Sequence, residues 1–132
     1  MPNVHSAYIH VPFCQHRCGY CNFTLVADRP DLVAAYLAAL AIELSQTLSE
    51  PQAIDTLYLG GGTPSFLQPD ELKQLLRLVT HWLPPARGCE FSCEMNPTDS
   101  TAEKLEILRS FGVNRISLGG QSFADRKLSV LE

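Results

Sequence analysis

Four short segments that suit β-strands alternate along the chain with three longer segments that suit amphipathic helices. The strand segments are rich in β-branched and aromatic residues, and the helix segments repeat apolar residues at spacings of three and four. The expected strands cover residues 7–11, 54–59, 90–94 and 113–118, and the expected helices cover 30–49, 69–83 and 101–111. This β-α-β-α-β-α-β order predicts an α/β fold with parallel strands and right-handed crossovers. It does not determine strand order, so an open sheet and part of a barrel both remain open.

Local signals set the ends of the expected helices. Pro30 and Pro69 stand in first turns, where proline suits a helix. Ser100 and Glu103 have the spacing of a capping box, and Gly112 is a typical C-cap residue. The third helix is therefore expected to be capped by Ser100 and to end before Gly112.

Composition excludes several classes of protein. The chain has 132 residues, of which 45% are apolar and 18% charged, as expected for one globular domain. A formal charge of −4 argues against a nucleic-acid partner and against a polybasic membrane patch. No apolar run approaches the roughly 20 residues of a membrane-spanning helix. The N-terminus also lacks a signal-peptide pattern, so we expect a cytoplasmic protein without a transmembrane segment.

Three of the five cysteines point to a metal site. Cys14, Cys18 and Cys21 follow a Cys-x3-Cys-x2-Cys pattern, which is too tightly clustered for a disulfide framework. In a chain without an export signal, this pattern indicates metal binding in a reducing compartment. An iron–sulfur cube normally takes four cysteine ligands. Three ligands would leave one iron open to a substrate or cofactor.

Two other interpretations of the cysteines remain open. Zinc accepts three cysteines and one histidine, so His10 or His16 would complete a structural zinc site. The usual zinc ligand pairs lie apart in sequence, which favours the iron–sulfur cluster, and inert core cysteines are the third interpretation. Cys89 and Cys93 lie roughly 13 Å apart on one expected strand. They cannot share a metal, and we expect them to be buried as small apolar residues.

Three further features follow the ends of expected strands. They are the glycine run Gly60–Gly62 with Thr63, the carboxylate Glu94 beside Asn96, and the amide Gln121. In parallel α/β folds, sites form at the edge where the strands end. The sequence therefore predicts that these features and the cysteine loop share one site.

Each of these features has a plain structural interpretation as well. The glycine run matches neither a Walker loop nor the dinucleotide fingerprint, so it is either a strand-end turn or backbone that a ligand approaches closely. Thr63 would add a hydroxyl there. Glu94 is either a solvated acid or an acceptor for a ribose diol, and Gln121 is either an ordinary loop amide or part of the site.

Taken together, the motifs resemble those of the radical S-adenosylmethionine (SAM) proteins. The matching segments are Tyr-Ile-His-Val-Pro-Phe-Cys-x3-Cys-x-Tyr-Cys-x-Phe at 8–23, Leu-Gly-Gly-Gly-Thr-Pro-Ser at 59–65, Glu-x-Asn-Pro at 94–97, Gly-Val-Asn-Arg-Ile-Ser-Leu-Gly at 112–119 and Gln-Ser-Phe at 121–123. The most similar branch is the oxygen-independent coproporphyrinogen III oxidase-like group, and within it the HemW-type haem chaperones. The resemblance extends from about Tyr8 to Leu131.

The resemblance implies two cofactors and a role for each matching position. A [4Fe–4S] cluster would be bound by Cys14, Cys18 and Cys21, and its fourth iron would be chelated by the amino and carboxylate groups of SAM. An electron from a reducing donor such as a flavodoxin-like protein would cleave the sulfonium of SAM and release a 5′-deoxyadenosyl radical. The implied SAM contacts are Tyr8 beside the methionine moiety, Gly61, Gly62 and Thr63 at the methionine end, Glu94 on the ribose hydroxyls, and Gln121.

One position distinguishes the branches of this family. Coproporphyrinogen oxidases typically carry a further cysteine two residues after the third, and this chain has Phe23 there. The resemblance therefore favours a haem chaperone that binds haem and delivers it to haemoproteins, with peripheral membrane contact through those targets. The alternatives are porphyrinogen oxidation by an enzyme and, in another class, a zinc-stabilised α/β binding module. Whether the protein is an enzyme stays open.

The family pattern also differs from this chain in two respects. Gly120 stands where the family usually has valine. Family members are hundreds of residues long and complete a (β/α)6 partial barrel before a C-terminal domain. Residues 1–132 are accordingly expected to form an incomplete radical SAM core with about four of the six βα units.

Overall fold

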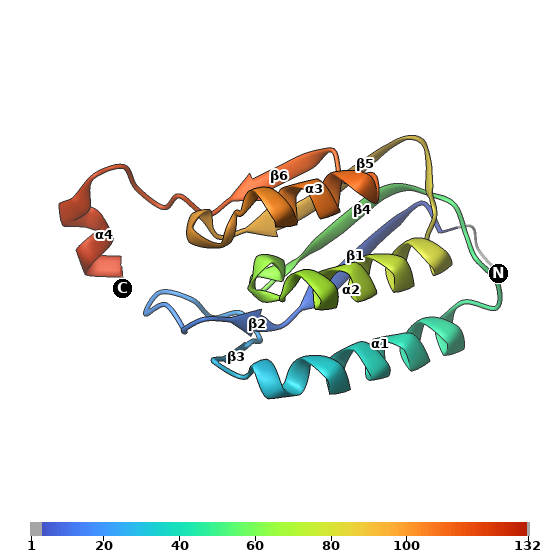
Figure 1. Ribbon diagram of the computed structural model, residues 1–132, viewed down its shortest axis with the longest axis horizontal. Helices are drawn as coiled ribbons and strands as arrows, with labels where there is room; N and C mark the ends of the chain where they lie inside the picture. The colour runs from blue at the N-terminus through green and yellow to red at the C-terminus, as the bar shows by residue number, and fades with distance from the viewer. Residues whose placement is uncertain (1–3, 132) are drawn as a thin grey trace.

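A parallel four-stranded sheet forms the centre of the computed structural model, which describes residues 4–131 (Figure 1). Its strands lie in the order β1-β4-β5-β6, which is also their order along the chain. The strands are β1 (Ser6–Val11), β4 (Ile54–Gly61), β5 (Pro85–Met95) and β6 (Arg115–Leu118). Met1–Asn3 and Glu132 lie outside the described residues. The predicted domain 1–132 includes all four of these residues, and the N-terminal stretch judged for a signal peptide includes the first three.

Three helices cover one face of this sheet. They are α1 (Val33–Thr47), α2 (Pro69–Trp82) and α3 (Ala102–Ser110), and they lie side by side in front of the strands in Figure 1. Right-handed crossovers between strands in sequential order place every helix on the same face. A doubly wound sheet instead reverses its strand order and carries helices on both faces. The α/β prediction is confirmed, and the arrangement fits part of a barrel.

The two faces of the sheet differ in character because side chains alternate along a strand. The face under the helices is apolar, and Val11, Leu57 and Phe91 are fully buried there. The opposite face is polar, and no helix of residues 4–131 covers it. Its side chains include Tyr8 and His10 from β1, Thr56 and Tyr58 from β4, Glu90, Ser92 and Glu94 from β5, and Arg115 and Ser117 from β6.

Several elements differ from the sequence expectation. Strand β5 begins at Pro85 rather than at 90, with a register irregularity against β4 between Ile54 and Thr56. Helix α1 is preceded by a 3-10 turn at Pro30–Leu32. Two further 3-10 turns, a short helix α4 and a two-stranded parallel pair, β2 with β3, were not predicted because segments so short carry no periodic signal. These elements are η2 (Pro64–Phe66), η3 (Pro97–Asp99), α4 (Asp125–Leu131), β2 (Phe13–Cys14) and β3 (Val26–Ala27).

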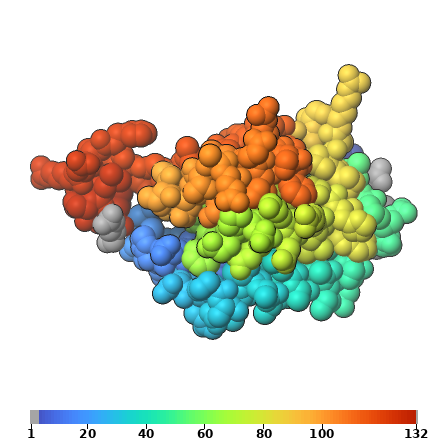
Figure 2. Space-filling model, viewed as in Figure 1, coloured from blue at the N-terminus to red at the C-terminus, as the bar shows by residue number. Residues whose placement is uncertain are grey.

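Helix α4 stands apart from the sheet. Figure 2 shows the last segment of the chain, in red, projecting from the rest of the molecule. Phe123 and Val130 of this segment are exposed apolar side chains. Among the described residues, no helix combines the length and the apolar character that crossing a membrane requires.

The predicted cap of α3 was wrong by one residue. Thr101, not Ser100, is the N-cap, and its side chain accepts a hydrogen bond from the Lys104 N–H. The Ser100 hydroxyl donates instead to the Asn96 carbonyl at 3.0 Å, so it is used by the preceding turn. The C-terminal prediction is confirmed, since Gly112 has a φ of +97°, which favours glycine.

Replacing Thr101 by alanine is expected to lower the free energy of unfolding by about 1 kcal/mol, because the Lys104 N–H loses its capping acceptor. Urea unfolding of the two proteins measures the difference. The matched control is Glu103→Gln, which would remove the charge of the residue that the sequence placed in the capping box. An equal loss in the control would contradict the assignment of Thr101 as the cap.

Candidate functional site

The cysteine loop is fastened at its base to the strand that precedes it. Its two ends pair as β2 and β3, where the Val26 N–H donates to the Pro12 carbonyl at 2.7 Å and the Asp28 N–H donates to the Cys14 carbonyl at 2.9 Å. Within the loop, the Arg17 guanidinium donates to the carbonyls of Phe23 and Leu25 at 3.2 and 2.9 Å. The loop therefore leaves and rejoins the protein at nearly the same point.

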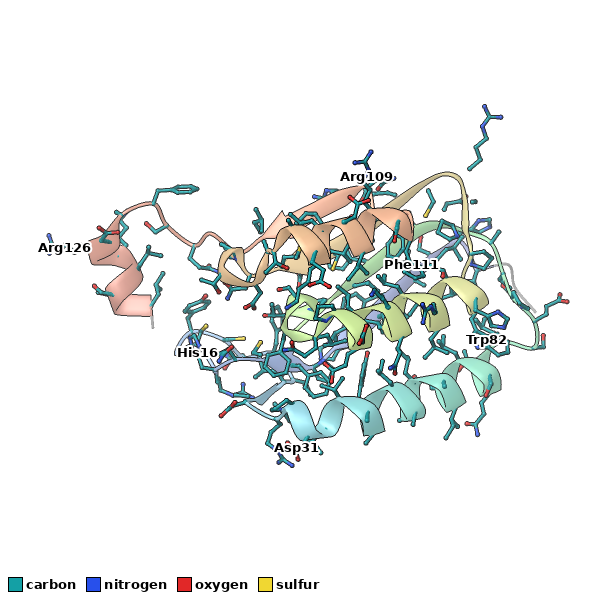
Figure 3. The ribbon with its side chains drawn as sticks, in the orientation of Figure 1. His16, Asp31, Trp82, Arg109, Phe111 and Arg126 are labelled. Carbon is teal, nitrogen blue, oxygen red and sulfur yellow. The ribbon has the colours of Figure 1, made fainter. Side chains whose placement is uncertain are left out.

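The three predicted cluster ligands lie on this loop as free, partly exposed thiols. Cys14 Sγ lies 3.4 Å from the Thr63 hydroxyl, and Cys18 Sγ lies 3.7 Å from Nε2 of His16, which is labelled in Figure 3. Burial raises the pKa of the Cys14 thiol, the hydrogen bond to Thr63 lowers it, and electrostatic interaction with the neighbouring Cys21 and Cys18 raises it. Over residues 4–131, no three His, Cys, Asp or Glu side chains are gathered into a set that would hold a metal. The donor chemistry fits a cluster, but the loop does not hold the thiols in a closed ligand set.

The other two cysteines differ clearly from these three. Cys89 and Cys93 are buried, as expected. Burial raises the pKa of Cys93 to about 12, with a further contribution from the Glu94 charge, so this thiol stays protonated at neutral pH. Their assignment as core residues is confirmed.

The glycine run packs directly against the chain that enters the cysteine loop. The Gly62 N–H donates to the Val11 carbonyl at 2.8 Å, and the Thr63 N–H donates to the Phe13 carbonyl at 2.6 Å. A Cβ at Gly62 would lie 2.6 Å from the Phe13 carbonyl oxygen, which is backbone and cannot move aside easily. Glycine is thus required here for close approach between two segments of the protein, whatever ligand the run meets.

Gly61 is restricted in a second way. Its φ is +106°, a region that side chains rarely adopt, and a Cβ there would overlap the His10 ring. Its N–H donates to Glu94 Oε2 at 3.1 Å. The predicted site residues Gly61 and Glu94 are therefore in direct contact, although they come from different strands.

Glu94 has a second partner that sequence reasoning missed. The Tyr58 hydroxyl donates to Glu94 Oε1 at 2.7 Å from the adjacent strand. Burial, and then the hydrogen bond to Glu94, raise the pKa of Tyr58. Each carboxylate oxygen offers about two acceptor positions, so Glu94 can accept one more hydrogen bond on each oxygen. Side chains alternate along β4, which puts Tyr58 on the open face. This alternation is the sequence signal that could have identified Tyr58 as a site residue.

Tyr8 and His10 lie next to this group on β1. The Tyr8 hydroxyl is 3.0 Å from His10 Nδ1, and the Tyr8 and Tyr58 rings are 6.0 Å apart between centroids. Burial, followed by the charge of Glu94, raises the pKa of Tyr8. His10 Nε2 lies 2.7 Å from the Thr24 carbonyl, which can only accept, so that nitrogen must carry the proton. Both His10 nitrogens are thus already engaged, which argues against His10 as a zinc ligand.

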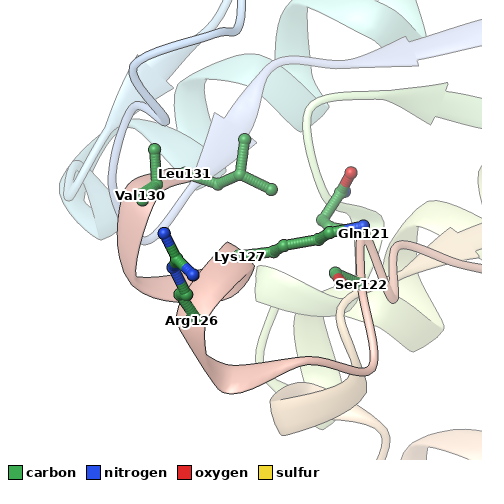
Figure 4. A pocket seen from close by; sticks show the side chains of 6 residues that line it. All are labelled: Gln121, Ser122, Arg126, Lys127, Val130 and Leu131. Carbon is green, nitrogen blue, oxygen red and sulfur yellow. The ribbon is translucent and has the colours of Figure 1, made fainter.

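Gln121 lies away from these groups. It has a φ of +53°, and its side chain lines a hollow between the β6 loop and α4 (Figure 4). Within the described part of the chain, no hydrogen bond joins Gln121 to another predicted site residue. The hollow is lined by Gln121, Ser122, Arg126, Lys127, Val130 and Leu131.

The structure therefore gathers most of the predicted site at one edge of the sheet. Cys14 meets Thr63, Gly61 meets Glu94, and Tyr8 lies beside them. Tyr58 joins this group through its hydrogen bond to Glu94, and His10 joins it through Tyr8.

Comparison with known proteins places the chain among relatives of two named kinds. It is 44% identical over 123 residues to the haem chaperone HemW of Bacillus subtilis, covering 91% of this chain and 32% of that protein. It is 36% identical to the oxygen-independent coproporphyrinogen III oxidase of Bradyrhizobium diazoefficiens, covering 89% of this chain and 27% of that protein. The chain therefore spans about a third of the length of these relatives or less.

A solved structure has the same fold. Coproporphyrinogen III oxidase (HemN) from Escherichia coli, described as a radical SAM enzyme, superposes with a TM-score of 0.88 and 27% identity, covering 99% of this chain and 31% of that chain. The model of the radical SAM superfamily matches residues 8–132, nearly the full length. Membership of this superfamily implies a [4Fe–4S] cluster, SAM and an electron donor. The chain belongs to the radical SAM superfamily.

Proposed function

We propose that this chain is the cluster-binding core of a haem chaperone of the HemW type. The observation that carries the proposal is the loop with three free thiols, whose base is hydrogen-bonded to the segment Gly62–Thr63, while the adjacent Gly61 is hydrogen-bonded to Glu94. In this proposal Cys14, Cys18 and Cys21 bind the cluster. When bound, the cluster supplies the electron that reduces the sulfonium of SAM.

The cysteine loop would close when it takes up the cluster. Its base is held by β2, β3 and Arg17, so the turn between them is the part that can adjust. Cys14 must lose its proton on binding, and the raised pKa of its thiol makes uptake favour higher pH. Because the three thiols are partly exposed, iron and sulfide can reach them from solvent.

The groups around Glu94 would bind SAM. The N–H groups of Gly61, Gly62 and Thr63 are used within the protein, so these residues would contact the methionine moiety through other atoms. Glu94 has acceptor capacity left for ribose hydroxyls, and Tyr8 would lie against the methionine moiety. Gln121 would reach the cofactor through a change in the loop that follows β6.

Replacing Tyr58 by phenylalanine is expected to raise the Kd for SAM by about tenfold, because Glu94 loses the O–H donor that orients its carboxylate. Anaerobic titration of the reconstituted protein with SAM measures this. The matched control is Tyr36→Phe, which removes a hydroxyl that donates to the His10 carbonyl from the helix side of the sheet. Equal Kd values for Tyr58→Phe and the unchanged protein would argue against Glu94 as a ribose ligand.

Haem delivery is favoured over porphyrinogen oxidation by Phe23. The oxidase pattern has a cysteine at this position, whereas Phe23 offers an exposed aromatic ring, 63% accessible, on the cysteine loop. The similarity to HemW of B. subtilis supports the same choice. The second candidate function, oxidative decarboxylation of a porphyrinogen, is supported by the oxidase relatives and by the fold of HemN.

Two measurements separate these candidates and the zinc-bound alternative. Anaerobic purification followed by metal analysis should give iron and sulfide, and zinc at one equivalent without iron would favour the zinc-stabilised module. A longer protein that contains this chain should then bind haem and transfer it to an apo-haemoprotein. Decarboxylated product formed with SAM and a reductant, without haem transfer, would instead support the oxidase.

We also propose that residues 1–132 are the first βα units of a longer barrel. The support is the sequential order of the four strands and the share of HemN that the chain covers. A cytoplasmic location is proposed as well, since free, partly exposed thiols persist in a reducing compartment.

A further inference from the structure

Lys104 is a nearly buried lysine that the proposed SAM site does not use. It lies in α3, it is 8% exposed, and its Nζ donates to the Ser65 carbonyl at 2.6 Å. Taking an ammonium out of water is costly unless strong hydrogen bonds replace the water. The hydrogen bond from Lys104 to the Ser65 carbonyl therefore offsets part of the cost of burying the ammonium.

The residue that Lys104 holds belongs to the turn after the glycine run. Ser65 is 1% exposed and lies in η2, two residues after Thr63 in the chain. Its hydroxyl accepts a hydrogen bond from the Asn96 N–H at 3.0 Å, two residues beyond Glu94. Ser65 thus joins three segments: the turn itself, the end of β5 and helix α3.

We infer that Lys104, Ser65 and Asn96 form a positioning network that fixes the glycine run for SAM. Lys104 touches no cofactor atom in this scheme and acts through Ser65. The inference rests on the proposed SAM site, because it assigns the network to that site.

The physical basis is that Lys104 supplies the charged hydrogen-bond donor to the Ser65 carbonyl of this turn. The Phe66 N–H donates to the Thr63 carbonyl and the Leu67 N–H to the Pro64 carbonyl, at 2.9 and 3.2 Å, so the turn is held internally by two neutral hydrogen bonds. A charged donor makes a stronger bond than a neutral one. Without Lys104, the Ser65 carbonyl would be buried without its charged donor, and the turn would shift relative to Glu94.

The test compares Lys104→Met with the unchanged chain after anaerobic cluster reconstitution. We expect the Kd for SAM to rise about tenfold, with the iron content per chain unchanged, because the cysteine loop is not part of the network. Hydrogen exchange of the Phe66 and Leu67 amides, measured without cofactors, should become about tenfold faster. A structural role limited to general stability would instead lower the unfolding midpoint and leave the Kd of the folded fraction unchanged.

Two further variants make the outcome decisive. Lys73→Met removes a half-buried lysine of α2 that pairs with Asp70, and it should change neither quantity. Ser65→Ala removes only the hydroxyl acceptor and should give a smaller rise in Kd; it decides the question if Lys104→Met does not fold. Unchanged Kd and exchange in the folded variants would overturn the inference. Failure of the unchanged protein to bind SAM would overturn the proposed function, and the exchange result would then still show whether the network holds the turn.

Discussion

Replacing Cys14, Cys18 or Cys21 by alanine is expected to abolish cluster binding, from about four iron atoms per chain to almost none. Each variant would leave two thiols on the loop, which is too few to retain a cluster whose fourth iron has no protein ligand. Iron and sulfide analysis, together with the visible absorption after anaerobic reconstitution, measures the loss. The effect should be similar for the three positions because, in the proposed site, each thiol would hold a separate iron.

The chain contains its own controls for this experiment. Cys89→Ala and Cys93→Ala remove thiols that are buried in the core, so these variants should lose stability but keep their iron. A uniform loss of iron in all five variants would mean that cluster binding fails through unfolding. Full iron content in a Cys18→Ala variant would contradict the assigned ligand set.

Replacing Gly61 by alanine is expected to abolish measurable SAM binding and to lower the free energy of unfolding by about 2 kcal/mol. The φ of +106° is strained for alanine, and its Cβ would overlap the His10 ring. Either the ring or the strand end must move, and the Gly61 N–H would then leave Glu94. Urea unfolding and SAM titration of the reconstituted protein measure the two effects.

Gly120→Ala is the matched control for this substitution. The nearest atom to a Cβ at Gly120 is 3.8 Å away, on the Phe123 ring, so alanine fits there. Its effect on unfolding should stay within about 0.5 kcal/mol. Normal SAM affinity in a folded Gly61→Ala variant would remove Gly61 from the proposed site.

The elements of the fold were largely predictable because periodicity records which face of an element is buried. The apolar spacing in α1 and α2 and the two-residue alternation in β5 identified helices and a strand correctly. The errors fall where no period exists: the two-residue strands β2 and β3, the helix α4, and the cap at Thr101. There the outcome depends on hydrogen bonds, such as that of Ser100 to the Asn96 carbonyl, that a sequence does not display.

The location of the candidate site could be predicted from the sequence, but the contacts within it could not. Strand ends in a parallel sheet lie at one edge, which is why Glu94 and the glycine run could be placed together. The sequence did not indicate that Tyr58 donates to Glu94, that His10 bridges Tyr8 and Thr24, or that Lys104 reaches Ser65. The roles assigned to the cofactor contacts remain predictions.

By itself, the amino-acid sequence determined the α/β class and the superfamily, because the cysteine pattern and the hydrophobic periods are local in the chain. The tertiary structure alone decided strand order, the open polar face and the partners of Glu94, because these depend on contacts between residues far apart in the chain. It also changed the meaning of the glycines. Glycine is needed at positions 61 and 62 because the His10 ring and the Phe13 backbone occupy the space where a Cβ would lie.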